Sequence, residues 1–211
     1  MEKNYSKGEE IANTITHLIG AGLAMAGIAL LAIRGANYGT YKHIIGFTIF
    51  GVSTLLLYSM SSVYHMLEPH TKARRIFKIL DHSAIYILIS GTYTPYILTV
   101  LSGTASLILF ISQWGLTTLG ILFKVKFAGR MKLLSTLIYL FMGWMIIFFF
   151  KPLKDSLNPL ALNLLVASGI TYSVGTIFYM MKNIRFTHAI WHLFVLGGSV
   201  LAFLSVFYSV N

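Results

Sequence analysis

Long apolar runs separated by short charged breaks set the strictest limit on what this chain can fold into. A bilayer core requires about 20 apolar residues per helix, and runs of this kind recur from one end of the chain to the other. They predict spans at Glu10–Ile33, Ile44–Met66, Leu80–Val100, Thr104–Phe123, Leu133–Phe150, Pro159–Met181 and Thr187–Tyr208. The connections are too short to fold separately, so we expect residues 1–211 to form one all-α domain, a bundle of seven transmembrane helices.

The composition agrees with a membrane protein and excludes several other classes. Hydrophobic residues make up 56% of the chain and charged residues only 10%, far from the balance of soluble domains. The net charge of +10 could suggest nucleic-acid binding, but the basic residues lie in the breaks between apolar runs rather than on one face or arm. We therefore expect no nucleic-acid partner. Because the chain has no cysteine, any metal must be held by histidine and carboxylate groups.

The distribution of basic residues predicts the orientation in the membrane. Alternate connections, counted with the N-terminal segment, carry twelve Lys and Arg, whereas the other connections and the tail carry four. The positive-inside rule places the richer side in the cytoplasm. We therefore expect a cytoplasmic N-terminus and an external C-terminus. The acidic residues just before the first apolar run favour a retained first span over a cleaved signal peptide.

Several polar residues lie at depths where ionisable side chains cost about 2.5 to 3.5 kcal/mol each, so each requires a reason. They are Glu10, Asn13 and His17 in the first span, Ser61 and His65 at the end of the second, Asp81 at the start of the third, and His188 and His192 at the start of the last. The predicted topology brings all of them to the cytoplasmic side. The positions of these polar residues did not enter the count of Lys and Arg, so their shared side supports the predicted topology independently.

Three imidazoles and a carboxylate in one shallow layer indicate a metal site, and zinc is the ion that such a set favours. His188 and His192 lie four residues apart, so both rings can reach one ion. His65 from another helix would complete a three-histidine set and leave the fourth position for water. Asp81 would hydrogen-bond that water or take its proton, and Ser61 would donate to a developing oxyanion. Glu10, Asn13 and His17 would line the adjacent cavity.

Other histidines and aromatic residues have simpler interpretations. His43, His70 and His82 lie at loop or interfacial positions, where ordinary solvent contacts are expected, although His82 could substitute as a ligand. The segment GTYTPY, with Pro95, is expected to kink or end the third span. The residues alone leave open whether the metal performs chemistry, and which divalent ion is native.

The motifs EEIANTITH, SSVYH, DHSAIYILISGTYTPY and HAIWHLFVLGGS resemble the hemolysin III family of bacteria, over essentially the full chain. That family is related to the progestin and adipoQ receptors, and the wider superfamily includes alkaline ceramidases. The resemblance implies a seven-helix bundle in the bacterial plasma membrane, with a zinc site facing the cytoplasm. It also implies that His65, His188 and His192 are the zinc ligands, with Ser61 and Asp81 beside the metal.

Three functions are compatible with these features. The leading interpretation is a zinc protein that acts on or senses a membrane lipid, with attack of zinc-bound hydroxide on a lipid amide or ester as its chemistry. A channel or cytolytic pore is the first alternative, although the polar layer is confined to one side and no ring of like residues is evident. The second alternative is a lipid receptor with structural zinc. The lipid and the oligomeric state stay open.

Overall fold

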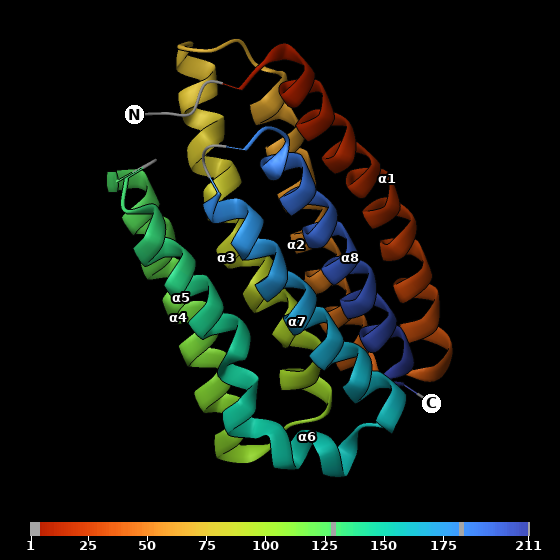
Figure 1. Cartoon of the computed structure of the whole chain (residues 1–211). Coiled ribbons are helices and arrows are strands. Elements are labelled where there is room, and N and C mark those ends of the chain that lie inside the picture. Colours follow the sequence, from red (N-terminus) through yellow and green to blue (C-terminus); the bar gives the residue numbers. More distant parts are fainter. Residues whose placement is uncertain (1–4, 128–129, 182–183, 211) are drawn as a thin grey trace.

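The computed structural model describes residues 5–127, 130–181 and 184–210, and these residues form eight α-helices and one 3-10 helix (Figure 1). The helices are α1 (Lys7–Tyr38), α2 (Tyr41–Met66), α3 (Lys72–Thr99), α4 (Gly103–Phe127), α5 (Lys132–Trp144), the 3-10 helix η1 (Met145–Phe149), α6 (Phe150–Ser156), α7 (Pro159–Met180) and α8 (Thr187–Tyr208). The all-α class is therefore confirmed. Lys3 and Lys182, which entered the charge count, and the start of the expected Lys182–Phe186 connection lie outside the described residues.

Six helical segments of the described chain are long and apolar enough to cross a membrane. They coincide with six of the seven predicted spans, and α5, η1 and α6 together supply one of them, Lys132–Ser156. Helix α3 is the exception. It begins at Lys72 rather than near Leu80, because the Thr71 side chain caps it by accepting from the Arg74 N–H. Its first turns therefore include the basic residues that we assigned to a connection.

We expected the segment GTYTPY to kink or to end the third span. The second of these expectations is wrong, because α3 does not end at Pro95. Pro95 lies inside the helix, which continues to Thr99. The N-terminal part of α2 packs closely here, since a Cβ added at Gly46 would lie 2.8 Å from the Pro95 Cα. Glycine thus allows α2 and α3 to approach at the proline.

The fifth predicted span, Leu133–Phe150, is not one regular helix. The α-helix α5 tightens into η1 and then restarts as α6. Pro152 is the third residue of α6, within the first turn, where its missing N–H costs no helical hydrogen bond. Restarting the helix at Phe150 therefore accommodates a proline that would interrupt a continuous span.

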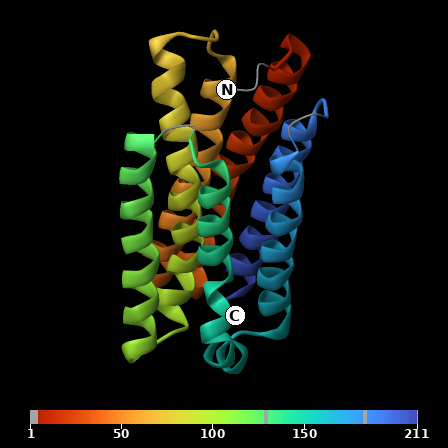
Figure 2. The ribbon, with the colours of Figure 1, turned by 60° about the vertical axis from the view of Figure 1, so that its left-hand side comes forward.

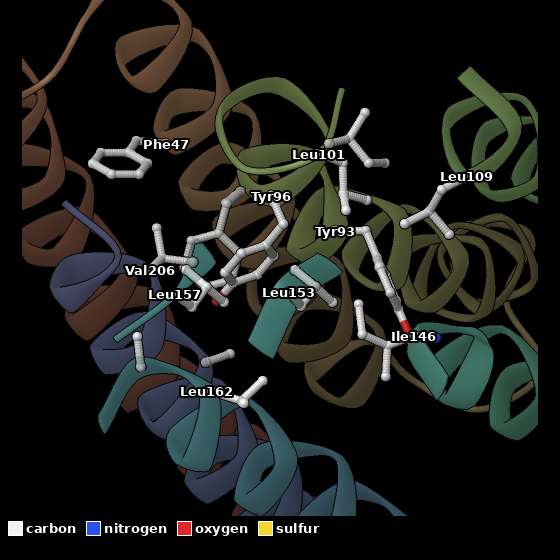
Figure 3. Close-up of a cluster of buried hydrophobic side chains, with 14 of the residues drawn as sticks. Phe47, Tyr93, Tyr96, Leu101, Leu109, Ile146, Leu153, Leu157, Leu162 and Val206 are labelled. Carbon is white, nitrogen blue, oxygen red and sulfur yellow. The ribbon is translucent and has the colours of Figure 1, made fainter. Parts of the chain in front are cut away.

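The outside of the bundle carries many large apolar side chains. Large hydrophobic side chains such as Ile111, Leu119 and Leu122 are about 60% exposed, which suits contact with lipid rather than water. The larger buried hydrophobic cluster gathers the late turns of α3 and α8, the early turns of α2 and α7, and α6 (Figure 3). This apolar core occupies the end of the bundle where α6 lies (Figures 1 and 2).

The first and last helices lie side by side and run in the same direction (Figure 1). At the end near α6, Arg34 of α1 donates from Nη2 to the Val210 carbonyl at 2.7 Å and from Nε to the Phe207 carbonyl at 3.3 Å. A guanidinium thereby satisfies carbonyls at the C-terminus of α8 that have no helical partner. The shared direction places the start of both helices at the opposite end, where the polar residues collect.

Candidate metal centre

The polar residues come together at the end of the bundle formed by the start of α1, the α2–α3 connection and the start of α8 (Figure 1). Local capping fixes two of these elements. Ser6 and Glu9 form a capping box at the start of α1, and the other Glu9 carboxylate oxygen accepts from the Phe186 N–H at 3.1 Å. One carboxylate therefore holds the first turn of α8 against the first turn of α1.

His65, His188 and His192 converge at this end. Each offers one nitrogen, and the three nitrogens lie within 4.8 Å of one another. His65 and His192 are buried and His188 is partly buried, and the His188 ring centre is 5.1 Å from that of His65 and 4.6 Å from that of His192. The three histidines selected from the sequence are thus close enough to hold one metal ion.

In His65 and His192, the hydrogen bonds are made by Nδ1, which leaves Nε2 available for a metal. The Nδ1 of His65 lies 2.6 Å from the Glu10 Oε2, and the Nδ1 of His192 lies 3.1 Å from the Asn13 carbonyl. Because these oxygens accept, a neutral ring at either position carries its proton on Nδ1 and keeps a lone pair on Nε2. Both Nε2 atoms are buried without a hydrogen-bond partner among the described residues. Nitrogen ligands held in this way suit zinc.

We expected Glu10, Asn13 and His17, on the polar face of α1, to line the adjacent cavity. Glu10 and Asn13 are not among the residues that line the cavity near the histidines, whereas His17 is. Glu10 instead bridges His65 and the guanidinium of Arg74, which also donates to the Leu67 carbonyl. The α2–α3 connection is thereby tied through Glu10 to a candidate metal ligand. The contribution of Arg74 was missed, because no spacing in the sequence relates it to Glu10.

Tyr5 is a second residue that sequence reasoning missed. Its ring centre lies 5.1 Å from that of His188 and 6.0 Å from that of His65. Burial raises the pKa of its hydroxyl above the ordinary range. Tyr5 precedes the first helix and belongs to no helical face, so periodicity could not indicate it. It packs against the histidines from the side of the chain's start.

A cavity of about 130 Å³ is lined by His17, whose ring stacks on that of His192 with the centres 3.5 Å apart, whereas the three clustered histidines themselves do not line it. Its lining is largely apolar and comes from α3, α5, α7 and α8, and Asp81 and His17 also line it. Asp81 is buried and lies within interaction range of His65 and Ser61, which is itself buried. The structure therefore places Asp81 on the wall of the cavity and Ser61 within interaction range of Asp81.

The remaining histidines are outside the cluster. The Nδ1 of His43 accepts from the Thr40 N–H at 3.0 Å and helps to start α2. His70 is exposed in the α2–α3 connection, and His82 follows Asp81 on α3 without joining the three clustered histidines. None of the three supplies a ligand to the cluster.

A bundle of membrane-spanning helices with three converging histidines at one end defines a class of multi-pass membrane protein with a candidate metal centre. The chain belongs to the haemolysin-III related family, whose model matches residues 5–203. This confirms the resemblance drawn from the motifs.

Individual relatives span nearly the whole chain. It is 53% identical over 204 residues to the hemolysin-3 homolog of Bacillus subtilis (strain 168), covering 96% of this chain and 95% of the relative. It is 48% identical over 202 residues to hemolysin-3 of Bacillus cereus, covering 96% and 92%. A more distant relative, the monocyte to macrophage differentiation factor of Homo sapiens, is 27% identical over 207 residues, covering 94% and 83%.

Proposed function

We propose that this chain is a seven-span plasma-membrane protein, with its N-terminus in the cytoplasm, that binds zinc and hydrolyses an amide or ester bond of a membrane lipid. The observation that carries the proposal is the convergence of three histidines near a largely apolar cavity, whose wall includes Asp81, a carboxylate within interaction range of His65. A metal ion, a proton acceptor and space for an apolar chain are the components that hydrolysis of a lipid requires.

Each residue of the site has a distinct task in this proposal. His65, His188 and His192 would hold zinc, which would supply a Lewis acid for a carbonyl group and lower the pKa of a bound water toward neutral pH. Asp81 accepts the proton of the attacking water and passes it to the leaving group. The Ser61 hydroxyl donates to the carbonyl oxygen as negative charge develops on it. The apolar cavity wall holds the acyl chain and excludes bulk water from the reacting group.

Metal content is the first test. Detergent-purified native protein is compared with His65→Ala and His192→Ala by elemental mass spectrometry. We expect about one zinc per chain in the native protein and loss of zinc in both variants, because three ligands are needed to retain the ion. Native protein purified without chelator and free of metal would contradict the proposal.

The role of Asp81 is tested separately from zinc binding. Asp81→Asn keeps the size of the side chain but cannot take a proton, so we expect zinc to be retained while hydrolysis of a fluorescent lipid amide or ester falls at least about 100-fold. Thr92→Val, on the same helix and the same cavity, is the matched control. Full turnover in Asp81→Asn would remove the residue from the mechanism.

The names of the two Bacillus relatives, both hemolysins, favour a second candidate, a cytolytic pore. Against it, the described residues pack an apolar core across the end of the bundle opposite the histidines. Conductance in planar bilayers that survives loss of the zinc ligands would favour the pore. Tight binding of a lipid with no product after long incubation would instead favour a receptor with structural zinc.

A further inference from the structure

The cavity is elongated along the helices of the bundle. On α3 the residues that line it recur on one face of the helix, and they are Asp81, Ile85, Leu88, Ile89, Thr92 and Tyr93. Asp81 and Tyr93 are twelve residues apart, which corresponds to about 18 Å along the helix axis. On α7 the lining runs from Tyr179, within interaction range of Asp81, to Leu165, which packs against the apolar core. Two helices therefore give the cavity the same two ends.

The cavity is about as wide as one hydrocarbon chain. Groups of the size of a water molecule or a methylene can place their centres in about 130 Å³ of it. Spread over a length of about 18 Å, this volume is a path about 3 Å across for those centres. One chain of methylene groups can follow such a path. Two chains side by side cannot, because their carbon atoms must stay about 3.5 to 4 Å apart.

The serine and threonine hydroxyls on the cavity wall donate their protons to carbonyl groups of the protein. Thr92 donates to the Leu88 carbonyl and Ser168 donates to the Gly198 carbonyl, both at 2.8 Å. The other three such residues of the lining do the same, and they are Thr136, Ser173 and Thr176. A ligand along this wall therefore meets no free hydroxyl donor from these five residues, which suits a hydrocarbon chain.

Tyr93 and Ile146 close the end of the cavity opposite Asp81, since both line the cavity and both belong to the apolar core (Figure 3). The α-helix α5 ends at Trp144, where η1 follows. The Tyr93 hydroxyl accepts from the Ile146 N–H at 3.1 Å and donates to the Gly143 carbonyl. This hydroxyl therefore joins α3 to the break after α5 and fixes both residues at the floor of the cavity.

We propose that the cavity admits one hydrocarbon chain of limited length, and that Tyr93 and Ile146 set the limit. An extended chain of single bonds advances about 1.2 Å per bond, so a length of about 18 Å holds about 15 carbons. A longer chain must displace close-packed core residues or leave part of its length outside. This inference rests on the proposed function and narrows its substrates to lipids that place one chain of about this length in the cavity.

Single-chain alkyl ethers of glycerol test the limit, because they contain no amide or ester bond to hydrolyse. Straight chains of about 10 to 22 carbons bracket the expected length. An equimolar mixture is equilibrated with detergent-purified protein, and the bound ethers are identified by native mass spectrometry. The variants are Ile146→Ala, at the floor, and Ile89→Phe, on the wall one turn before Tyr93. The matched control is Ile97→Ala, in the same apolar core but not among the residues that line the cavity.

We expect the native protein to bind ethers of up to about 15 carbons, and to bind those about four carbons longer at least about tenfold more weakly. Ile146→Ala removes part of the floor and should raise the limit by about two to three carbons. Ile89→Phe adds volume to the wall and should lower the limit. Ile97→Ala removes the same side-chain atoms from the core and should leave the limit unchanged.

A limit that stays the same in folded Ile146→Ala, or that rises equally in Ile97→Ala, would overturn the inference. Equal binding of all lengths by the native protein, or binding of none, would also overturn it. Ile89→Phe gives a second test that does not depend on the folding of Ile146→Ala, and an unchanged or higher limit there would count against the inference in the same way.

Hydrolysis is followed separately with glycerol monoesters of the same chain lengths. A length limit for the ethers without product from the esters would refute hydrolysis and leave the inference intact. Hydrolysis of the esters at equal rates, whatever their length, would do the reverse.

Discussion

At the scale of single residues, His65 and His192 each hydrogen-bond the protein through Nδ1 and leave Nε2 free for a metal ion. His65 is oriented by the Glu10 carboxylate and His192 by the Asn13 carbonyl. Such partners fix the tautomer of a ligand and strengthen its interaction with a metal. The polar face of α1 therefore contributes to the candidate metal centre mainly through the orientation of ligands that come from α2 and α8.

Glu10→Gln should weaken zinc binding without abolishing it. The amide cannot supply the negative charge that stabilises the His65 N–H, and its contact with Arg74 loses the ion pair. Loss of partners of this kind lowers metal affinity about 10- to 100-fold. Competition with a zinc chelator measures the change.

Glu68→Gln is the matched control for this experiment, because Glu68 is an exposed carboxylate in the α2–α3 connection. It should leave the zinc affinity unchanged. Equal affinity of Glu10→Gln and native protein would mean that the carboxylate does not act on the ligand.

The sequence was sufficient to select the three histidines but not their partners. Spacing within a helix, combined with the alternation of the spans, places His65, His188 and His192 in one layer, and the structure brings them together. Arg74 and Tyr5 could not be found in this way. Their contacts depend on the path of a connection and of the segment before α1, neither of which has a repeat to follow.

At the scale of helices, some boundaries could be predicted from the sequence and others could not. Helices α7 and α8 begin at the predicted residues and end within one residue of the predicted positions. Asn158 caps α7 immediately before a proline, which is a strong local signal. Helix α3 begins eight residues early because Thr71 caps it, and hydropathy does not detect a charged first turn. The break between α5 and α6 could not be predicted, because it depends on which helical turn can accommodate Pro152.

Gly46→Ala should destabilise the protein, because the close approach of α2 and α3 leaves no room for a methyl group. The added carbon would lie 2.8 Å from the backbone of Pro95, which cannot move without shifting α3. Overpacking of this kind costs about 1 to 3 kcal/mol. Thermal unfolding in detergent should show a lower midpoint.

Gly22→Ala provides the comparison, because a Cβ at Gly22 meets nothing within 4 Å. In the interior of α1, alanine should raise the midpoint slightly, since glycine costs about 0.5 to 1 kcal/mol in a helix. Because alanine improves helix propensity at both positions, a similar fall in both variants would mean that the α2–α3 contact does not determine the result.

At the scale of the whole molecule, the two ends of the bundle differ. One end holds the candidate metal centre, and the other holds the apolar core and the Arg34 cap of α8. The alternation of the spans predicted that the polar residues would share one end. It could not predict the cavity, because the cavity is formed by side chains from several helices whose packing the sequence does not display.

The absence of cysteine from the chain permits a direct test of the orientation. Single cysteines are placed at His70, exposed at the end with the histidine cluster, and at Ser102, exposed at the opposite end. A membrane-impermeant maleimide should label Ser102→Cys in intact cells and His70→Cys only after lysis, because we place the N-terminus in the cytoplasm. The unmodified chain is the unlabelled control, and the reverse pattern would invert the proposed topology.

The three clustered histidines come from α2 and α8, which are separated by 120 residues of sequence, and this has a consequence for biosynthesis. A ribosome reaches His188 on the order of ten seconds after His65. Until α8 has been translated and inserted, a nascent chain has one of the three nitrogens and cannot close the cluster. A messenger truncated before the codon of residue 187 would yield a chain without the cluster, so under the proposed function only chains that include α8 would bind the metal.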